Sequence, residues 1–118
     1  MTPYVSAHTA SATGSSTAPS VAVTSASGNM VVDVVANGSN ITSSDKTQRW
    51  LKNVNTSNGG GNGAQSTAVG AASVTMSYTV TSDWWAIIGV DVNAAVDKSP
   101  LNWAATRKPN LGASARYI

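Results

Sequence analysis

An alternation of apolar and polar residues that begins at Val74 constrains the fold of this 118-residue chain more than any other feature. Val74, Met76, Tyr78 and Val80 occupy every second position, and Ser or Thr fills the positions between them. A period of two is typical of a β-strand with one face on a core and the other in solvent. The sequence therefore predicts a half-buried strand here.

A second run, from Trp84 to Val92, follows the short polar turn at residues 81–83. Adjacent strand residues point to opposite faces, so Trp84 and Trp85 make this run apolar on both sides near its start. Such a strand is usually central and covered on each face. A turn of this length commonly joins antiparallel neighbours, so the two runs are expected to form a hairpin. Trp85 and Ile87 then need a cover, either the chain's own arm or another subunit.

The composition favours an all-β chain. Only 10% of the residues are charged and none is Glu, whereas surface helices normally carry Glu and Lys on their wet face. Ser, Thr and Val are abundant and Gly marks the breaks, as in chains of short strands. We expect one all-β domain, a jelly-roll-like β-sandwich of about six or seven strands.

Three regions are expected along the chain. Residues 1–19 are aperiodic and contain Pro3 and Pro19, which predicts an extended N-terminal arm. Residues 20–96 hold the β-sandwich, and residues 97–118 form a basic, Pro-punctuated C-terminal arm. The strands expected before the alternating run are residues 20–25, 30–36, 47–54 and 64–70, with a short edge strand near Ile41.

Charge is distributed unevenly. Residues 1–97 carry three Lys or Arg against five Asp, a net charge of −2, whereas residues 98–118 carry four Lys or Arg and no acid, a net charge of +4. A basic tail on a mildly acidic body can contact an acidic neighbouring subunit. Nucleic acid is not expected, because the body has no matching basic stripe.

No group of residues predicts catalysis, a metal site or a cofactor site. The only histidine, His8, lies in the expected N-terminal arm, where solvation is the simplest interpretation. The chain has no cysteine. The glycine-rich segment at residues 59–63 lacks the Lys of a phosphate-binding loop. Asp33 and Asp91 lie within expected strands, and we expect them to face solvent; the alternative is a pair that binds a cation together with Asn oxygens. The protein is not expected to be an enzyme.

The tryptophans offer a candidate ligand platform. One of Trp84 and Trp85 should belong to the core. Trp85 or Trp50, on an exposed face, is the candidate for stacking on a sugar ring. Burial under an arm or against a neighbouring subunit is the simpler interpretation.

The order of these segments resembles a known family. Ser-Val-Ala-Val-Thr-Ser-Ala-Ser-Gly-Asn-Met-Val-Val-Asp-Val-Val-Ala, a Gly/Asn/Ser loop, Ala-Ser-Val-Thr-Met-Ser-Tyr-Thr and Asp-Trp-Trp-Ala-Ile-Ile-Gly-Val follow one another. Over residues 21–92 this is similar to the C-terminal half of concanavalin A-like, jelly-roll modules, which are frequent in phage virion proteins and bacterial surface proteins. The resemblance implies that further strands are missing and that the sandwich is completed by association. The basic tail departs from the family pattern.

These features predict a non-enzymatic structural protein located in the virion, most simply a phage capsid decoration (cement) protein or a tail protein. It would act as a homo-oligomer or on the major capsid protein, through open strand edges and arms. The expected subunit-contact residues are Leu101, Trp103, Arg107, Lys108, Leu111, Arg116 and Tyr117. The alternative is a lectin-like carbohydrate-binding module that uses Trp50 or Trp85 with loop Asn and Asp residues. No segment is apolar for long enough to predict a membrane span.

Overall fold

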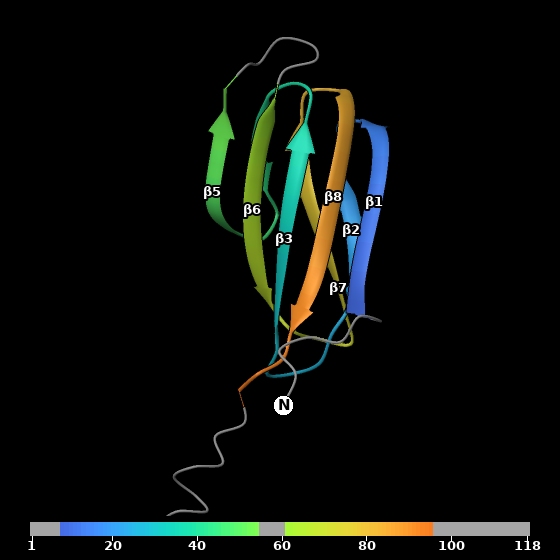
Figure 1. Ribbon diagram of the computed structural model, residues 1–118, viewed down its shortest axis with the longest axis vertical. Coiled ribbons are helices and arrows are strands. Elements are labelled where there is room, and N and C mark those ends of the chain that lie inside the picture. Colours follow the sequence, from blue (N-terminus) through green and yellow to red (C-terminus); the bar gives the residue numbers. More distant parts are fainter. Residues whose placement is uncertain (1–7, 55–60, 96–118) are drawn as a thin grey trace, which may run out of the picture.

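The computed structural model describes residues 8–54 and 61–95, which form eight β-strands (Figure 1). The strands are β1 (Thr9–Ser16), β2 (Ser20–Thr24), β3 (Met30–Asn37), β4 (Ile41–Ser44), β5 (Thr47–Asn53), β6 (Asn62–Val69), β7 (Ser73–Val80) and β8 (Asp83–Val92). They build a five-stranded antiparallel sheet, in the order β1-β8-β3-β6-β5, and a three-stranded one, in the order β2-β7-β4. The all-β sandwich is confirmed, with eight described strands where about six or seven were expected. No helix long and apolar enough to cross a membrane occurs in the described part of the chain.

The strands expected in the middle of the chain are confirmed. The segments at residues 20–25, 30–36, 47–54 and 64–70 correspond to β2, β3, β5 and β6, and the short strand near Ile41 is β4. The alternating run is β7, and its inward residues Val74, Met76, Tyr78 and Val80 are all buried. Hydrophobic periodicity was therefore a sound guide wherever large apolar residues alternate.

Strand β1 was not expected, because it lies in the segment assigned to an extended arm. It pairs with β8 from Thr9 opposite Val90 to Ser16 opposite Asp83. Its inward side is small, with Ala10 and Ala12 packed against the core, so it lacks the large alternating residues that mark a strand. The expected arm is wrong for this stretch. Residues 1–7 and the expected C-terminal arm at residues 97–118 lie outside the described residues.

The expected hairpin between β7 and β8 is also wrong. β7 lies between β2 and β4, whereas β8 lies between β1 and β3 in the other sheet. The backbone N–H of Val80 donates to Thr17 O (3.0 Å), and that of Thr81 donates to Asn40 O (2.8 Å). These bonds tie the end of β7 to segments other than β8, so the link between β7 and β8 crosses from one sheet to the other.

The core lies between the two sheets. Val23, Val31, Val35, Met76 and Ile87 are almost completely buried there. Gly89 of β8 also faces this layer, and a Cβ at Gly89 would collide with Cγ2 of Val23. A glycine at that position allows the sheets to approach each other closely.

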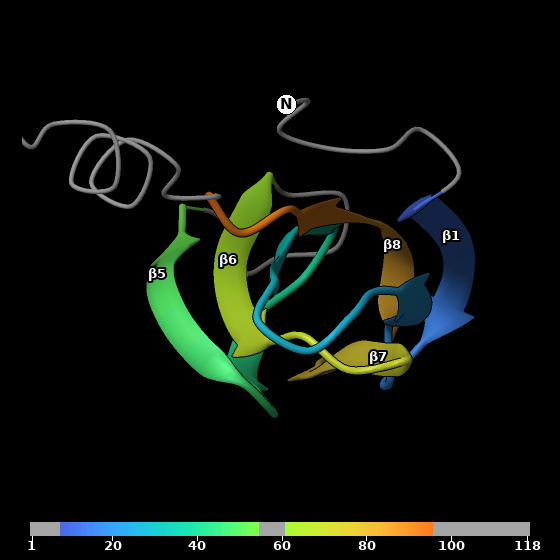
Figure 2. The ribbon, with the colours of Figure 1, turned by 90° about the horizontal axis from the view of Figure 1, so that it is seen from below.

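The five-stranded sheet curls around the three-stranded sheet (Figure 2). Its concave face packs on the core, and its convex face points away from the three-stranded sheet. No described element covers that convex face, which is called the outer face below.

Candidate binding surface on the outer face of the five-stranded sheet

Asp33 is buried between the sheets, so the expectation that it faces solvent is wrong. It is 1% exposed. Its Oδ1 accepts hydrogen bonds from the Tyr78 hydroxyl (2.6 Å) and the Ser66 N–H (2.8 Å), and its Oδ2 accepts one from the Ser66 hydroxyl (2.8 Å). Burial, and then the hydrogen bond to Asp33, raise the pKa of Tyr78 well above its usual range. Because β3 and β6 belong to one sheet and β7 to the other, this cluster joins the two sheets.

Asp91 is buried as well, with 0% of its side chain exposed. Its Oδ1 accepts a hydrogen bond from the Ser25 hydroxyl (2.5 Å), and the Asn29 amide lies 3.0 Å from its Oδ2. His8 Nδ1 also lies 3.0 Å from Oδ2, so His8 is held at the sheet edge rather than solvated as expected. Burial raises the pKa of Asp91, but the hydrogen bonds from Ser25, His8 and Asn29 outweigh burial and hold that pKa below its ordinary value.

The contacts of these two acids hold strands and loops together. Ser25 donates to Asp91 and not to His8, so in the part of the chain that the structure describes no serine is paired with a histidine base as a nucleophile requires. The oxygens of Asp33 are already occupied by three donors. Within residues 8–54 and 61–95, no three His, Cys, Asp or Glu side chains gather as a metal site would need. The functional candidates therefore lie on the outer face.

An aliphatic strip runs along β3 and β8 on the outer face. Cross-strand neighbours Met30 and Val92, Val32 and Val90, and Val34 and Ile88 form its three rows. Ile88 is 52% exposed, Val34 is 49% exposed and Met30 is 46% exposed. A contiguous aliphatic surface of this kind is unusual on an isolated soluble domain and commonly marks a contact site.

The face of β8 that lacks a cover is the opposite of the one expected from the sequence. Sequence reasoning assigned the unexplained face to Trp85 and Ile87, but Ile87 is 1% exposed and belongs to the core. The uncovered face carries Trp84, Ile88 and Val92 instead. The alternation along β8 was predicted correctly, whereas its direction relative to the core was not.

Trp85 is the inward member of the tryptophan pair and does not lie on an exposed face as its proposed role requires. It packs against the core, and its Nε1 donates to the Ser16 hydroxyl (3.0 Å). Gly14 is the cross-strand neighbour of Trp85. A Cβ at Gly14 would lie 2.6 Å from Cζ2 of Trp85, so the glycine leaves room for the indole beside β1. Trp84 is the exposed partner, at 75%. Adjacent tryptophans carry no sequence signal that tells which of them points outward.

A groove of about 430 Å³ lies beside Trp84. Its lining includes Thr13, Ala36, Gly38, Gly61, Trp84 and Ala86. Ala36 and Ala86 are cross-strand neighbours, and Gly63 follows on the other side of Ala36. These small residues make a low floor between taller side chains. Asn37, 3% exposed, also lines the groove, and its Oδ1 accepts no hydrogen bond from any described residue.

Trp50 is the second exposed indole, at 45%, and lies on edge strand β5. Its Nε1 donates to Oε1 of Gln65 on β6 (2.8 Å). A Cβ at Gly63 would lie 3.2 Å from Cη2 of Trp50, so the ring extends over that glycine. The hydrogen bond and the glycine together hold the indole across β6. Trp50 is exposed, as the candidate ligand platform requires, whereas burial was the simpler interpretation of the sequence.

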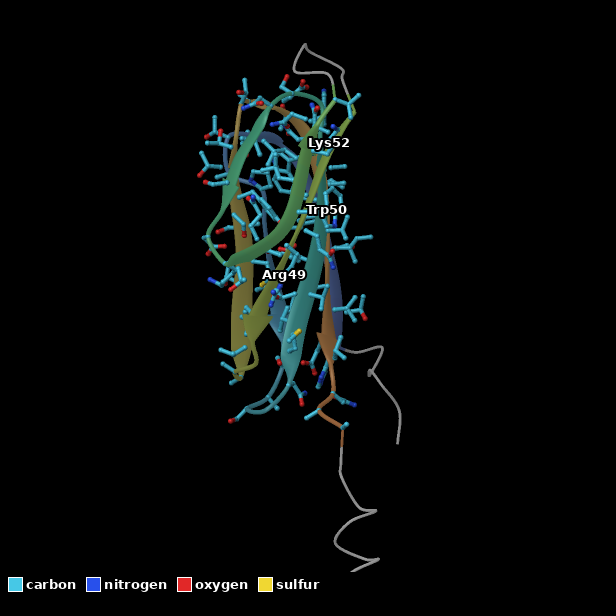
Figure 3. All side chains as sticks on the ribbon, turned by 90° about the vertical axis from the view of Figure 1, so that its left-hand side faces the viewer. Arg49, Trp50 and Lys52 are labelled. Atoms are coloured by element: carbon cyan, nitrogen blue, oxygen red, sulfur yellow. The ribbon has the colours of Figure 1, made fainter. Side chains whose placement is uncertain are left out.

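Two cations flank Trp50 on the same strand (Figure 3). Arg49 lies at a β-bulge, and its Nε donates to the Thr67 hydroxyl (2.7 Å). Lys52 is opposite Gly63 and forms no ion pair with any residue in the described ranges. Neither residue stands out in the sequence, because five Asp outnumber the three Lys and Arg of residues 1–97; Asp33 and Asp91, however, are buried in the structure.

The expected subunit-contact residues of the C-terminal arm, Leu101 to Tyr117, lie outside the described residues. Comparison with known proteins found no family model, no curated protein and no solved structure that matches this chain. The resemblance to concanavalin A-like modules therefore stays a prediction.

Proposed function

We propose that this chain is a non-enzymatic structural protein of a virus particle, most simply a phage capsid decoration protein, that acts by packing against neighbouring subunits. One observation carries the proposal: the aliphatic strip is open to solvent on a sheet whose other face is fully used by the core. Sheets normally bury such a face against a second layer. A neighbouring subunit would supply that layer.

The strip suits a second copy of this chain. It contains no charged side chain, so two strips can face each other without like-charge repulsion. Paired sheets pack about 10 Å apart through interdigitating side chains of this kind. A twofold contact uses the same patch on both partners, which a continuous aliphatic strip satisfies. The basic C-terminal arm would add contacts with the major capsid protein or with further copies.

Sedimentation velocity over a range of protein concentrations tests the contact. Wild-type protein is expected to self-associate, and Ile88→Asp or Val34→Asp should leave it monomeric, because each puts a charge into the buried contact. Thr75→Asp is the matched control, since Thr75 is exposed on β7 in the other sheet. A wild-type protein that stays monomeric at every concentration would contradict the contact between copies.

The virion assignment needs a separate test. Virus particles that encode this chain are purified by density gradient. Mass spectrometry of these particles should detect the chain at a constant ratio to the major capsid protein. Absence of the chain from purified particles would overturn the assignment, whatever the oligomeric state in solution.

A further inference from the structure

We propose that the outer face also carries a binding site for a short acidic oligosaccharide, which lies across the sheet from Trp50 to Trp84. The site borders the aliphatic strip, because Gln65, the partner of Trp50, lies opposite Val34. It goes beyond the structural role proposed above. It rests on the two exposed indoles, the low floor between them and the two cations at one end.

Trp50 is a pre-organised stacking platform. The Gln65 hydrogen bond fixes its Nε1 edge at 2.8 Å, and Gly63 leaves room for the ring to lie over β6. With one ring face toward the sheet, the other is open, in keeping with its 45% exposure. A ring held in this way loses little conformational entropy when it binds a flat ligand. The apolar face of a sugar ring is such a ligand.

Trp84 and the groove continue the site. β5 and β8 are three strands apart, which at about 4.8 Å per strand separates them by about 14 Å. Gly63 lies under the Trp50 ring, and the floor beyond it includes the small residues Ala36 and Ala86. An extended chain of more than one sugar fits this span better than a single ring. At the far end of the groove, the exposed indole of Trp84 offers a second ring face to the ligand.

Charge complementarity indicates that the ligand is acidic. Arg49 and Lys52 lie on either side of Trp50 in the sequence, and neither pairs with a carboxylate in the described structure. The carboxylates of Asp33 and Asp91 are buried, and Asp45 is paired with Lys46 (2.8 Å). Uronic acid carboxylates are groups that Arg and Lys would bind beside a stacked ring.

An oligosaccharide is favoured over a single-stranded nucleic acid. Binding along a nucleic acid backbone uses a basic track that neutralises successive phosphates. Here two cations stand at one end of the site, and none of the described residues that line the groove at the other end is charged. This arrangement matches a ligand with few charges and many C–H and O–H groups.

Titration calorimetry with trigalacturonate, a mannuronate trimer and a sulfated trisaccharide tests the proposal, with intrinsic tryptophan fluorescence as a second readout. At least one of these acidic ligands should bind more tightly than the neutral galactose trimer by about tenfold. The preference should shrink as NaCl is raised from about 0.05 M to about 0.5 M, because the ion pairs are exposed.

Variants separate stacking from charge. Trp50→Ala should weaken binding by about tenfold and Trp50→Tyr should largely restore it, because tyrosine keeps a ring at the platform. Arg49→Gln with Lys52→Gln should abolish the preference for acidic over neutral ligand. Lys46→Gln is the matched control and should change nothing, since Lys46 is already paired with Asp45.

Three outcomes overturn the proposal. They are no binding of any acidic trisaccharide at millimolar concentration, equal binding of the neutral trimer, and tighter binding of oligo(dT) or tripolyphosphate than of the sugars. A second copy packed on the strip would also cover this site, so the titrations are repeated with Ile88→Asp, which leaves Trp50, Arg49 and Lys52 unchanged.

Discussion

The hydroxyl of Tyr78, in the three-stranded sheet, donates a hydrogen bond of 2.6 Å to the carboxylate of Asp33, in the five-stranded sheet, and both side chains are buried. A charged acceptor in the interior strengthens such a bond. It links one sheet to the other within a core that is otherwise mainly aliphatic.

Tyr78→Phe should destabilise the protein by about 1–3 kcal/mol, because it removes one of the three donors to a buried carboxylate. Urea unfolding followed by far-UV circular dichroism measures the change. Thr79→Val is the control on the same strand, at an exposed position. An unchanged midpoint for Tyr78→Phe would show that the bond contributes nothing net to stability.

Acid should destabilise the fold through Asp91. Its pKa is lower in the folded protein than in the unfolded chain, so its contribution to stability is complete above the unfolded value of about 3.9 and is lost as the pH falls through the folded value. Urea midpoints measured from neutral pH downward should fall below about pH 4. Asp91→Asn should be less stable at neutral pH and should show a shallower decline. An equal decline in both proteins would assign the acid sensitivity to other groups.

Gly89→Ala should lower stability by about 1–3 kcal/mol, because its methyl group would overlap Val23 between the sheets. Gly61→Ala is the matched control, since a Cβ there meets no atom within 4 Å. Thermal unfolding of the two variants makes the comparison. Equal melting temperatures would mean that the sheets separate easily at this point.

The directions of Trp84 and Trp85 can be checked by fluorescence. Trp84→Phe should remove the more solvent-exposed emission and shift the remaining spectrum to the blue, whereas Trp85→Phe should leave a more red-shifted spectrum. Acrylamide quenching should fall for Trp84→Phe and rise for Trp85→Phe. The reverse pattern would mean that Trp85 points outward and Trp84 inward, which would remove Trp84 from the groove.

Periodicity predicted β7, β3 and the fold class, because one buried face leaves a direct mark on every second residue. It could not predict that β7 and β8 lie in different sheets, since alternation reports which residues are buried and not which strand is the neighbour. β1 was missed because Ala10, Ala12 and Gly14 fit under larger neighbours without any apolar signal of their own.

The acids were misjudged for a related reason. Burial of Asp33 depends on Tyr78 and Ser66, which are 45 and 33 residues away in the sequence. Burial of Asp91 depends on Ser25, 66 residues away. No local sequence pattern predicts hydrogen-bond partners that are so far away in the chain. Because Asp33 and Asp91 are buried, they do not offset the positive charge of Arg49 and Lys52 on the surface beside Trp50.

The pairing of β1 with β8 also determines when this protein can fold. The edge strand at Thr9–Ser16 has one described strand to pair with in its sheet, the strand at Asp83–Val92, which is the last of the eight to be synthesised. During translation β1 must therefore wait, unpaired, until almost all of the sandwich has left the ribosome. Contacts over such sequence distances slow folding, so the first strand in the chain should be among the last to become protected from hydrogen exchange.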